Sequence, residues 1–215
     1  IVGSPGDDDL QDRGALWIIS LNPGGTVASW AKISATSGGF GGVLLPEDHF
    51  GSSVVPLGDL DGDGTVELAV GASEDSDGGF KQGAVWILSL NADGTVASET
   101  KISETSGGFG GVLDSNDYFG TSLAAPGDLD GDGKEDLTVG AHGNDDSAFA
   151  EGAMWFLSLN SDATVASWSK LSAIHGWLGC VLDLGDLFGV SVAALGDLDG
   201  YGRGDIAVGA SHDGD

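Results

Sequence analysis

The sequence predicts an all-β fold made of four-stranded antiparallel sheets that recur along the chain. Three observations predict it. One stretch occurs three times, each full 69-residue period contains four short apolar runs separated by turn residues, and no segment has the length and period of a helix. The stretch begins at Phe50, Phe119 and Phe188, and both intervals are 69 residues long.

The period that begins at Phe50 shows how the four expected strands follow one another, at roughly 51–57, 66–71, 83–90 and 96–103. The first two flank an acidic, glycine-rich loop that suits a hairpin. The third is apolar without alternation, so we expect it to be covered on both faces. Residues 91–94 form a hairpin turn before the fourth strand. A propeller blade has this arrangement, because each sheet is sandwiched between its neighbours.

The whole chain, 1–215, is predicted to be one repeat region. We expect a partial blade with strands two to four, followed by a linker, in 1–49. Full blades follow in 50–118 and 119–187, and a partial blade with the first two strands occupies 188–215. Both chain ends fall in the same phase of the repeat, so we interpret the chain as a window of a longer array, either a partial propeller or an open array of blades.

Composition excludes several classes of partner. Acidic residues outnumber basic ones 34 to 7 and the formal charge is −27, whereas binding to nucleic acid or an anionic membrane requires a basic surface. Cys180 is the only cysteine, which excludes a disulfide framework and a thiolate zinc site. No apolar stretch is long enough to insert into a membrane.

The acidic loops carry oxygen ligands at alternate positions. Because glycines let the backbone curl, carboxylates at positions 1, 3, 5 and 9 and the backbone carbonyl at position 7 can surround one cation. A flexible cage of oxygen atoms suits Ca²⁺ better than Mg²⁺. The predicted ligands are Asp59, Asp61, Asp63, Thr65 and Glu67 in the first loop, and Asp128, Asp130, Asp132, Lys134 and Asp136 in the second. The alternative is that these are acidic surface turns, but repetition in register favours calcium.

The third loop departs from this pattern. It offers Asp197, Asp199, Arg203 and Asp205, but Tyr201 replaces the carboxylate at position 5. One fewer anion and a nearby cation predict a weaker third calcium site. Residues 203–205 also spell Arg-Gly-Asp, the tripeptide that integrins recognise, and we interpret this as coincidence because Asp205 is needed as a ligand.

The repeated stretch resembles the FG-GAP repeat, the blade unit of the integrin α-subunit head and of many bacterial extracellular proteins. The resemblance is carried by the Phe-Gly opening, the Asp-x-Asp-Gly-Asp-Gly loop and a Val-Gly-Ala that stands where the family has Gly-Ala-Pro. It implies a β-propeller, usually of seven blades, with calcium between the first and second strands of a blade. A closed ring of seven blades would need about twice this length.

These observations predict an extracellular or cell-surface, calcium-binding module with a structural, adhesive or recognition role, as part of a surface protein or filament. We expect its partners to be neighbouring repeats, other copies of itself, or a protein or glycan, and not nucleic acid. Catalysis is not expected, because no histidine recurs and no nucleophile–base pattern is present. One rival is an accessory propeller of a secreted hydrolase. Another is a self-assembling fibre whose strand edges pair between copies.

Two sets of tryptophans are expected to differ in burial. Trp17, Trp86 and Trp155 are spaced by the repeat and are expected to pack between blades. Trp30 and Trp168 align with Glu99, so we expect that position to be exposed, and a binding role there has only weak support from the sequence.

Overall fold

The computed structural model describes residues 1–7, 11–176, 179 and 181–214, so Cys180 and Asp215 lie outside the described residues. All of the regular structure in the described ranges is β-strand, arranged in four antiparallel sheets, and the predicted all-β class is confirmed. These ranges contain no helix that is long and apolar enough to cross a membrane.

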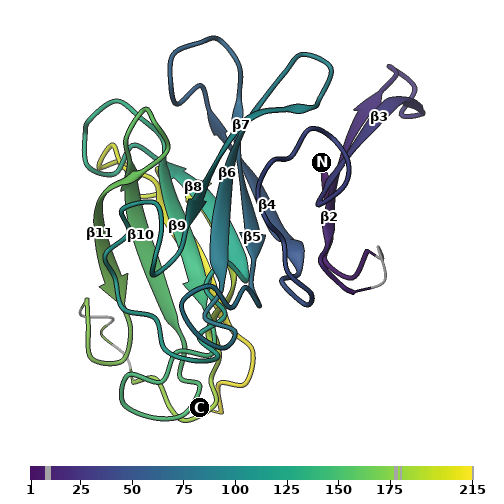
Figure 1. Cartoon of the computed structure of the whole chain (residues 1–215). Coiled ribbons are helices and arrows are strands. Elements are labelled where there is room, and N and C mark those ends of the chain that lie inside the picture. Colours follow the sequence, from purple (N-terminus) through teal and green to yellow (C-terminus); the bar gives the residue numbers. More distant parts are fainter. Residues whose placement is uncertain (8–10, 177–178, 180, 215) are drawn as a thin grey trace.

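Each sheet is a meander in which the strands pair in chain order (Figure 1). The first sheet holds β1 (Val2–Ser4), β2 (Ala15–Leu21) and β3 (Val27–Ser34). The second holds β4 (Phe50–Gly58), β5 (Glu67–Ala72), β6 (Ala84–Leu90) and β7 (Val96–Ile102). The third holds β8 (Ser122–Gly127), β9 (Asp136–Ala141), β10 (Ala153–Leu159) and β11 (Val165–Leu171). The fourth holds β12 (Phe188–Gly196) and β13 (Asp205–Ala210).

The two middle strands of the second sheet are covered on both faces, as the unalternating apolar run predicts. Every residue of β5 is buried, and so is every residue of β6 except the half-buried Leu90. The turn after β6 closes because Gly94 adopts a φ of 82° and donates its N–H to the Asn91 carbonyl oxygen at 2.9 Å. Sequence periodicity and turn chemistry therefore agree on this half of the sheet.

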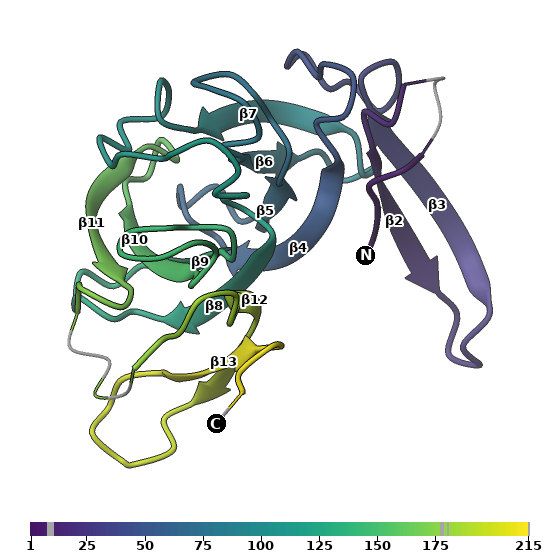
Figure 2. The same ribbon diagram turned by 90° about the horizontal axis from the view of Figure 1, so that it is seen from below.

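Successive sheets pack face to face in chain order, from β2–β3 at one end to β12–β13 at the other (Figure 2). The first strands of consecutive sheets lie side by side, β4 with β8 and β8 with β12. A parallel bridge joins Gly83 to Phe119, and its counterpart joins Gly152 to Phe188. A Cβ atom on Gly140 would collide with the Gly189 carbonyl oxygen, so the recurring Val-Gly-Ala needs glycine for this close approach.

The second and third sheets share one apolar core. Phe109 lies at its centre, with ring centroids 5.0 Å from both Phe119 and Trp155. Trp155 is 1% exposed and Trp86 is 5% exposed, so both are core residues as predicted, whereas Trp17 is only half-buried. Full burial of one such side chain contributes about 1.5–3 kcal/mol. This shared core fixes the ends of the two sheets relative to each other.

Antiparallel pairing places all three acidic loops at the same end of the sheets. They join β4 to β5, β8 to β9 and β12 to β13, and the β6–β7 and β10–β11 hairpins lie at that end as well. The connections from β5 to β6 and from β9 to β10 lie at the opposite end (Figure 1). The molecule therefore has an acidic-loop end and an opposite end that holds the β5–β6 and β9–β10 connections.

Candidate metal centres

The first acidic loop brings three carboxylates together. Asp59, Asp61 and Glu67 each offer an oxygen atom, and these atoms all lie within 4.8 Å of one another. The loop can curl because Gly62 and Gly64 have φ values of 83° and 90°, and their N–H groups donate to Asp59 at 2.8 and 3.0 Å. Positions 1, 3 and 9 of the loop thus face a common point.

Glu67 anchors this group from inside the protein. Glu67 is the first residue of β5 and is 3% exposed, and its Oε2 accepts a 2.6 Å hydrogen bond from the Leu60 N–H. Its other oxygen, Oε1, is buried and has no hydrogen-bond partner. Burying a carboxylate oxygen without a hydrogen-bond donor or a cation costs folding free energy. Oε1 of Glu67 is therefore a candidate ligand atom for a cation.

The second loop repeats this geometry with Asp128, Asp130 and Asp136, whose oxygen atoms again lie within 4.8 Å of one another. Asp136 is 3% exposed, and its Oδ2 accepts a 2.6 Å hydrogen bond from the Leu129 N–H. Its Oδ1 is buried without a partner. Burial raises the pKa of Asp136 above its usual range, and the Asp130 charge raises it further. A bound cation would counter both effects.

The carboxylates at position 5 lie outside these two groups. Asp63 Oδ1 accepts hydrogen bonds from the Thr65 N–H at 2.7 Å and the Thr65 hydroxyl at 2.6 Å, and these bonds lower the pKa of Asp63. Asp132 accepts from the Lys134 N–H and pairs with its ammonium group, both at 2.8 Å. Residues at positions 5 and 7 therefore bind each other in the structure.

The third loop also brings its acids together, but closer to solvent. Oxygen atoms of Asp197, Asp199 and Asp205 lie within 4.8 Å of one another, and Asp205 is half-buried. Tyr201 is 86% exposed. A Cβ atom on Gly204 would collide with the Pro126 carbonyl oxygen, so the Arg-Gly-Asp stretch packs closely against β8. Its Asp205 accepts a 2.7 Å hydrogen bond from the Leu198 N–H, which gives that residue a role within the loop.

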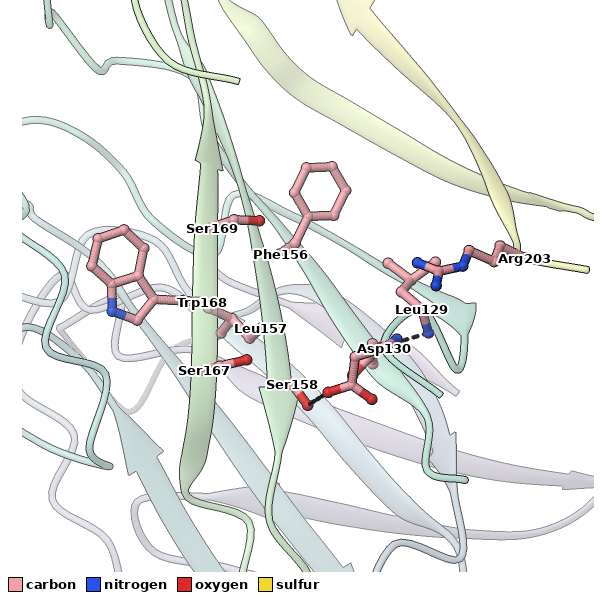
Figure 3. A pocket seen from close by; sticks show the side chains of 10 residues that line it. Leu129, Asp130, Phe156, Leu157, Ser158, Ser167, Trp168, Ser169 and Arg203 are labelled. Carbon is pink, nitrogen blue, oxygen red and sulfur yellow. Dashed lines mark hydrogen bonds between the residues drawn. The ribbon is translucent and has the colours of Figure 1, made fainter. Parts of the chain in front are cut away.

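Arg203 extends from the third loop toward the second (Figure 3). It lines a pocket of about 370 Å³ together with Asp130, Asp136 and side chains of β10 and β11. Ser158 on β10 donates a 2.6 Å hydrogen bond to Asp130 Oδ2 in the same pocket. Beside the first loop, the corresponding space is lined by residues 161–163 of the next sheet's hairpin. The space beside each of the first two acidic loops is therefore part of the contact between successive sheets.

The histidines outside these loops have separate surroundings. His49 Nδ1 lies 3.2 Å from Glu74, and His175 Nδ1 lies 3.2 Å from Asp146. His142 stacks on Tyr118 with ring centroids 4.9 Å apart, and burial lowers the pKa of His142. None of these three histidines lies in an acidic loop.

Comparison with known proteins adds the family. The FG-GAP repeat model matches residues 50–88 and 119–156, and each segment contains a complete acidic loop. The curated relatives include integrin alpha-PS2 of Drosophila melanogaster, 30% identical over 173 residues that make up 78% of this chain and 11% of the relative. Integrin alpha-7 of Homo sapiens is 35% identical over 145 residues, 66% of this chain and 10% of the relative. Integrin alpha-5 of Xenopus laevis is 40% identical over 97 residues, 45% of this chain and 9% of the relative.

Proposed function

The chain belongs to the FG-GAP repeat family, with integrin α subunits among its relatives, and we propose that it is a calcium-stabilised, non-enzymatic module of an extracellular or cell-surface protein. Its proposed role is structural, adhesive or recognition. The proposal includes the domain organisation: one repeat region, 1–215, with full blades at 50–118 and 119–187 and partial blades at 1–49 and 188–215. The alignments span only 9–11% of the length of the relatives named above, so activities of whole integrin subunits are not carried over.

The observation that carries the proposal is the unpaired buried oxygen in each of the first two loops. Glu67 Oε1 and Asp136 Oδ1 are buried without a hydrogen-bond donor, each beside two other carboxylates. Three anionic oxygens within 4.8 Å of one another repel, and leaving one of them unsatisfied adds to that cost. A divalent cation among the three would relieve both penalties.

Calcium fits this donor set better than the other common cations. All of the converging donors are oxygens, no described His or Cys joins the groups, and the loops are glycine-rich. Asp59, Asp61 and Glu67 would hold the first ion, and Asp128, Asp130 and Asp136 the second. Asp197, Asp199 and Asp205 would form the weaker third site.

Residues at positions 5 and 7 complete the proposed cages. Asp63 keeps one carboxylate oxygen, Oδ2, outside its hydrogen bonds to Thr65, so that oxygen remains available to a cation. Asp132 must share its carboxylate with Lys134. The backbone carbonyls of Thr65, Lys134 and Arg203 remain the proposed ligands at position 7.

Charge and repetition limit the proposed partners. With 34 acidic and 7 basic residues, the chain disfavours nucleic acid. Near-identical blades present similar surfaces to neighbouring repeats or to other copies of the chain, and a protein or glycan is the external partner that we propose.

The test is thermal unfolding of the 215-residue chain in excess Ca²⁺, in excess Mg²⁺ and in EGTA. At a free concentration of 100 times the Kd, one site adds about 2.7 kcal/mol, which raises the midpoint of a domain of this size by about 5–10 °C. The Asp61→Ala/Asp130→Ala variant should lose most of this rise. Asp93→Ala, which removes an acid from the β6–β7 hairpin turn, should keep it. If calcium does not change the unfolding midpoint, the loops are acidic surface turns and the calcium proposal is wrong.

A further inference from the structure

The opposite end of the sheets holds a cavity of about 280 Å³ between the two complete blades. One wall comes from the segment after β7, which contributes Gly110, Val112 and Asp114. The other comes from the third sheet and its connections, which contribute Asp146, Trp155, Trp168, Lys170 and His175. The volume lies just below the usual range for small-molecule sites, about 300–1,000 Å³, and suits a single ring.

Two indole rings supply the apolar surface of this cavity. Trp155 and Trp168 form a T-shaped pair with centroids 5.1 Å apart. Trp155 is 1% exposed, whereas Trp168 on β11 is 43% exposed. In Figure 3, Trp168 points to the opposite side of β11 from Ser167 and Ser169, and its ring lies 6.0 Å from Phe109 of the preceding blade. Trp168 therefore presents an accessible ring between the blades.

The cavity also contains polar groups that the protein leaves without partners. The Asp114 carboxylate has no hydrogen bond or ion pair among the described residues, while its backbone N–H donates to Asp117 at 3.0 Å. His175 uses Nδ1 toward Asp146 at 3.2 Å, which leaves the other ring nitrogen for a ligand. A ligand with several hydroxyl groups could donate to the carboxylate and bind the imidazole nitrogen in either tautomer.

The charges in the cavity argue against an ionic ligand. The Lys170 ammonium group already lies 5.0 Å from the Trp155 ring centroid and pairs with Asp146 at 2.6 Å, so the cation position over that ring is filled. Two carboxylates line the cavity and the chain carries a net charge of −27, which disfavours an anion. A neutral, polyhydroxylated ring fits both limits.

The interface one repeat earlier provides an internal comparison. It keeps Trp86 and Lys101, and their 5.6 Å cation–π contact. Leu45, Glu99 and Ser106 stand where the cavity has Asp114, Trp168 and His175. The exposed ring, the free carboxylate and the imidazole therefore occur together at only one of the two equivalent positions.

We propose that the cavity between the two complete blades is a binding site for one neutral sugar residue of a glycan, which stacks on Trp168 and hydrogen-bonds to Asp114. The inference gives the recognition role proposed above a ligand class. It does not depend on calcium in the acidic loops, which lie at the other end of the sheets, so its failure would leave the calcium proposal intact.

The experiment is an NMR titration of the calcium-loaded chain that follows the indole N–H resonances. The probes are methyl α-glucopyranoside, methyl β-galactopyranoside and N-acetylglucosamine, with sodium glucuronate as an anion and tetramethylammonium chloride as a cation. We expect saturable shifts of the Trp155 and Trp168 resonances with at least one neutral sugar and none with either ion. No saturable shift with any neutral sugar, at concentrations that fill a millimolar site, would overturn the proposal, as would tighter binding of either ion.

Variants that copy the earlier interface control for misfolding, because the same residues fold there. Trp168→Glu and Asp114→Leu should each lower the affinity for the sugar by about tenfold or more. Trp30→Ala is the matched control, since Trp30 is a 64% exposed tryptophan that pairs with Trp17 at 5.2 Å but lies outside the cavity. If Trp30→Ala weakens binding as much as Trp168→Glu does, the site is not this cavity.

Discussion

Replacing Asp136 by asparagine should shift the stability of the protein in opposite directions with and without calcium. Asp136 is 3% exposed, accepts hydrogen bonds from the Leu129 N–H at 2.6 Å and the Asp130 N–H at 3.3 Å, and leaves Oδ1 unpaired. Oxygen atoms of Asp128 and Asp130 lie within 4.8 Å. Asparagine keeps the size of the side chain and the carbonyl that accepts from Leu129, but it removes the buried charge.

The expected magnitude follows from the charges. Two unit charges about 5 Å apart repel by about 1 kcal/mol in water and by about 3 kcal/mol at an effective dielectric constant of 20. Because Asp130 is exposed, we take the lower part of this range. Asp136→Asn should therefore stabilise the calcium-free protein by about 1–2 kcal/mol. With calcium at 100 times the wild-type Kd, the wild type gains about 2.7 kcal/mol from this site, so the variant should become the less stable protein by about 1–2 kcal/mol.

Urea unfolding at neutral pH, in EGTA and in excess Ca²⁺, measures both differences. Asp93→Asn provides the matched control, because Asp93 is an acid in the β6–β7 hairpin that accepts hydrogen bonds from Thr95. The control should change stability by a similar small amount in both media. If Asp136→Asn destabilises the protein equally with and without calcium, Asp136 is only a structural cap and the electrostatic argument is wrong.

Three further predictions follow from the loops and their surroundings. Asp130→Asn should weaken calcium binding by about tenfold or more. Asp132→Asn should weaken it much less, because Asp130 belongs to the converging group of carboxylates and Asp132 does not. Equal losses of affinity in a calorimetric titration would contradict this grouping. Tyr201→Asp combined with Arg203→Thr gives the third loop the residues that the first loop has at positions 5 and 7, and should raise the calcium affinity of the third site. An unchanged affinity would show that Tyr201 and Arg203 do not weaken that site. Burial raises the pKa of Asp117 to about 6, so the folded state binds this proton more tightly than the unfolded state, and the contribution of Asp117 to stability should increase as the pH falls from 8 to 5. Asp117→Asn should remove that contribution, so the thermal unfolding midpoint of the calcium-free variant should rise less than that of the wild type as the pH falls. An identical rise in the two proteins would refute this role of Asp117.

The sequence predicts the sheets well because every local preference agrees with the fold. The apolar run of β6, the turn before β7 and the 69-residue interval all indicate the strands that form. The meeting of loop positions 1, 3 and 9 follows from the same repetition, although the ligand assignments themselves remain predictions.

The parts that the sequence does not predict depend on competing contacts or on distant segments. The spacing of acids does not show that Asp63 turns toward Thr65, because a side chain can bind a backbone N–H two residues away instead of facing the loop centre. The cavity between the blades unites Asp114 with Trp168 and His175, which lie more than fifty residues further along the chain. These residues do not recur in the repeat, and it is this departure from repetition that could have marked the site.

A buried aspartate that caps a turn recurs in each repeat, and its regular spacing is visible in the sequence. Aspartate recurs at the repeat interval in Asp48, Asp117 and Asp186, each of which accepts a hydrogen bond from the backbone N–H three residues earlier. All three are buried, at 2%, 0% and 4% exposure. Their regular spacing could have identified them as caps of the turn that precedes each blade.

Anomalous scattering from crystals grown with calcium tests the central claim most directly. The account predicts a peak about 2.3–2.6 Å from carboxylate oxygens of Asp59, Asp61 and Glu67, an equivalent peak in the second loop, and a weaker one in the third. Density should disappear from the first two loops in crystals of Asp61→Ala/Asp130→Ala. The absence of a peak in both loops at saturating calcium would contradict the claim that these loops are metal centres.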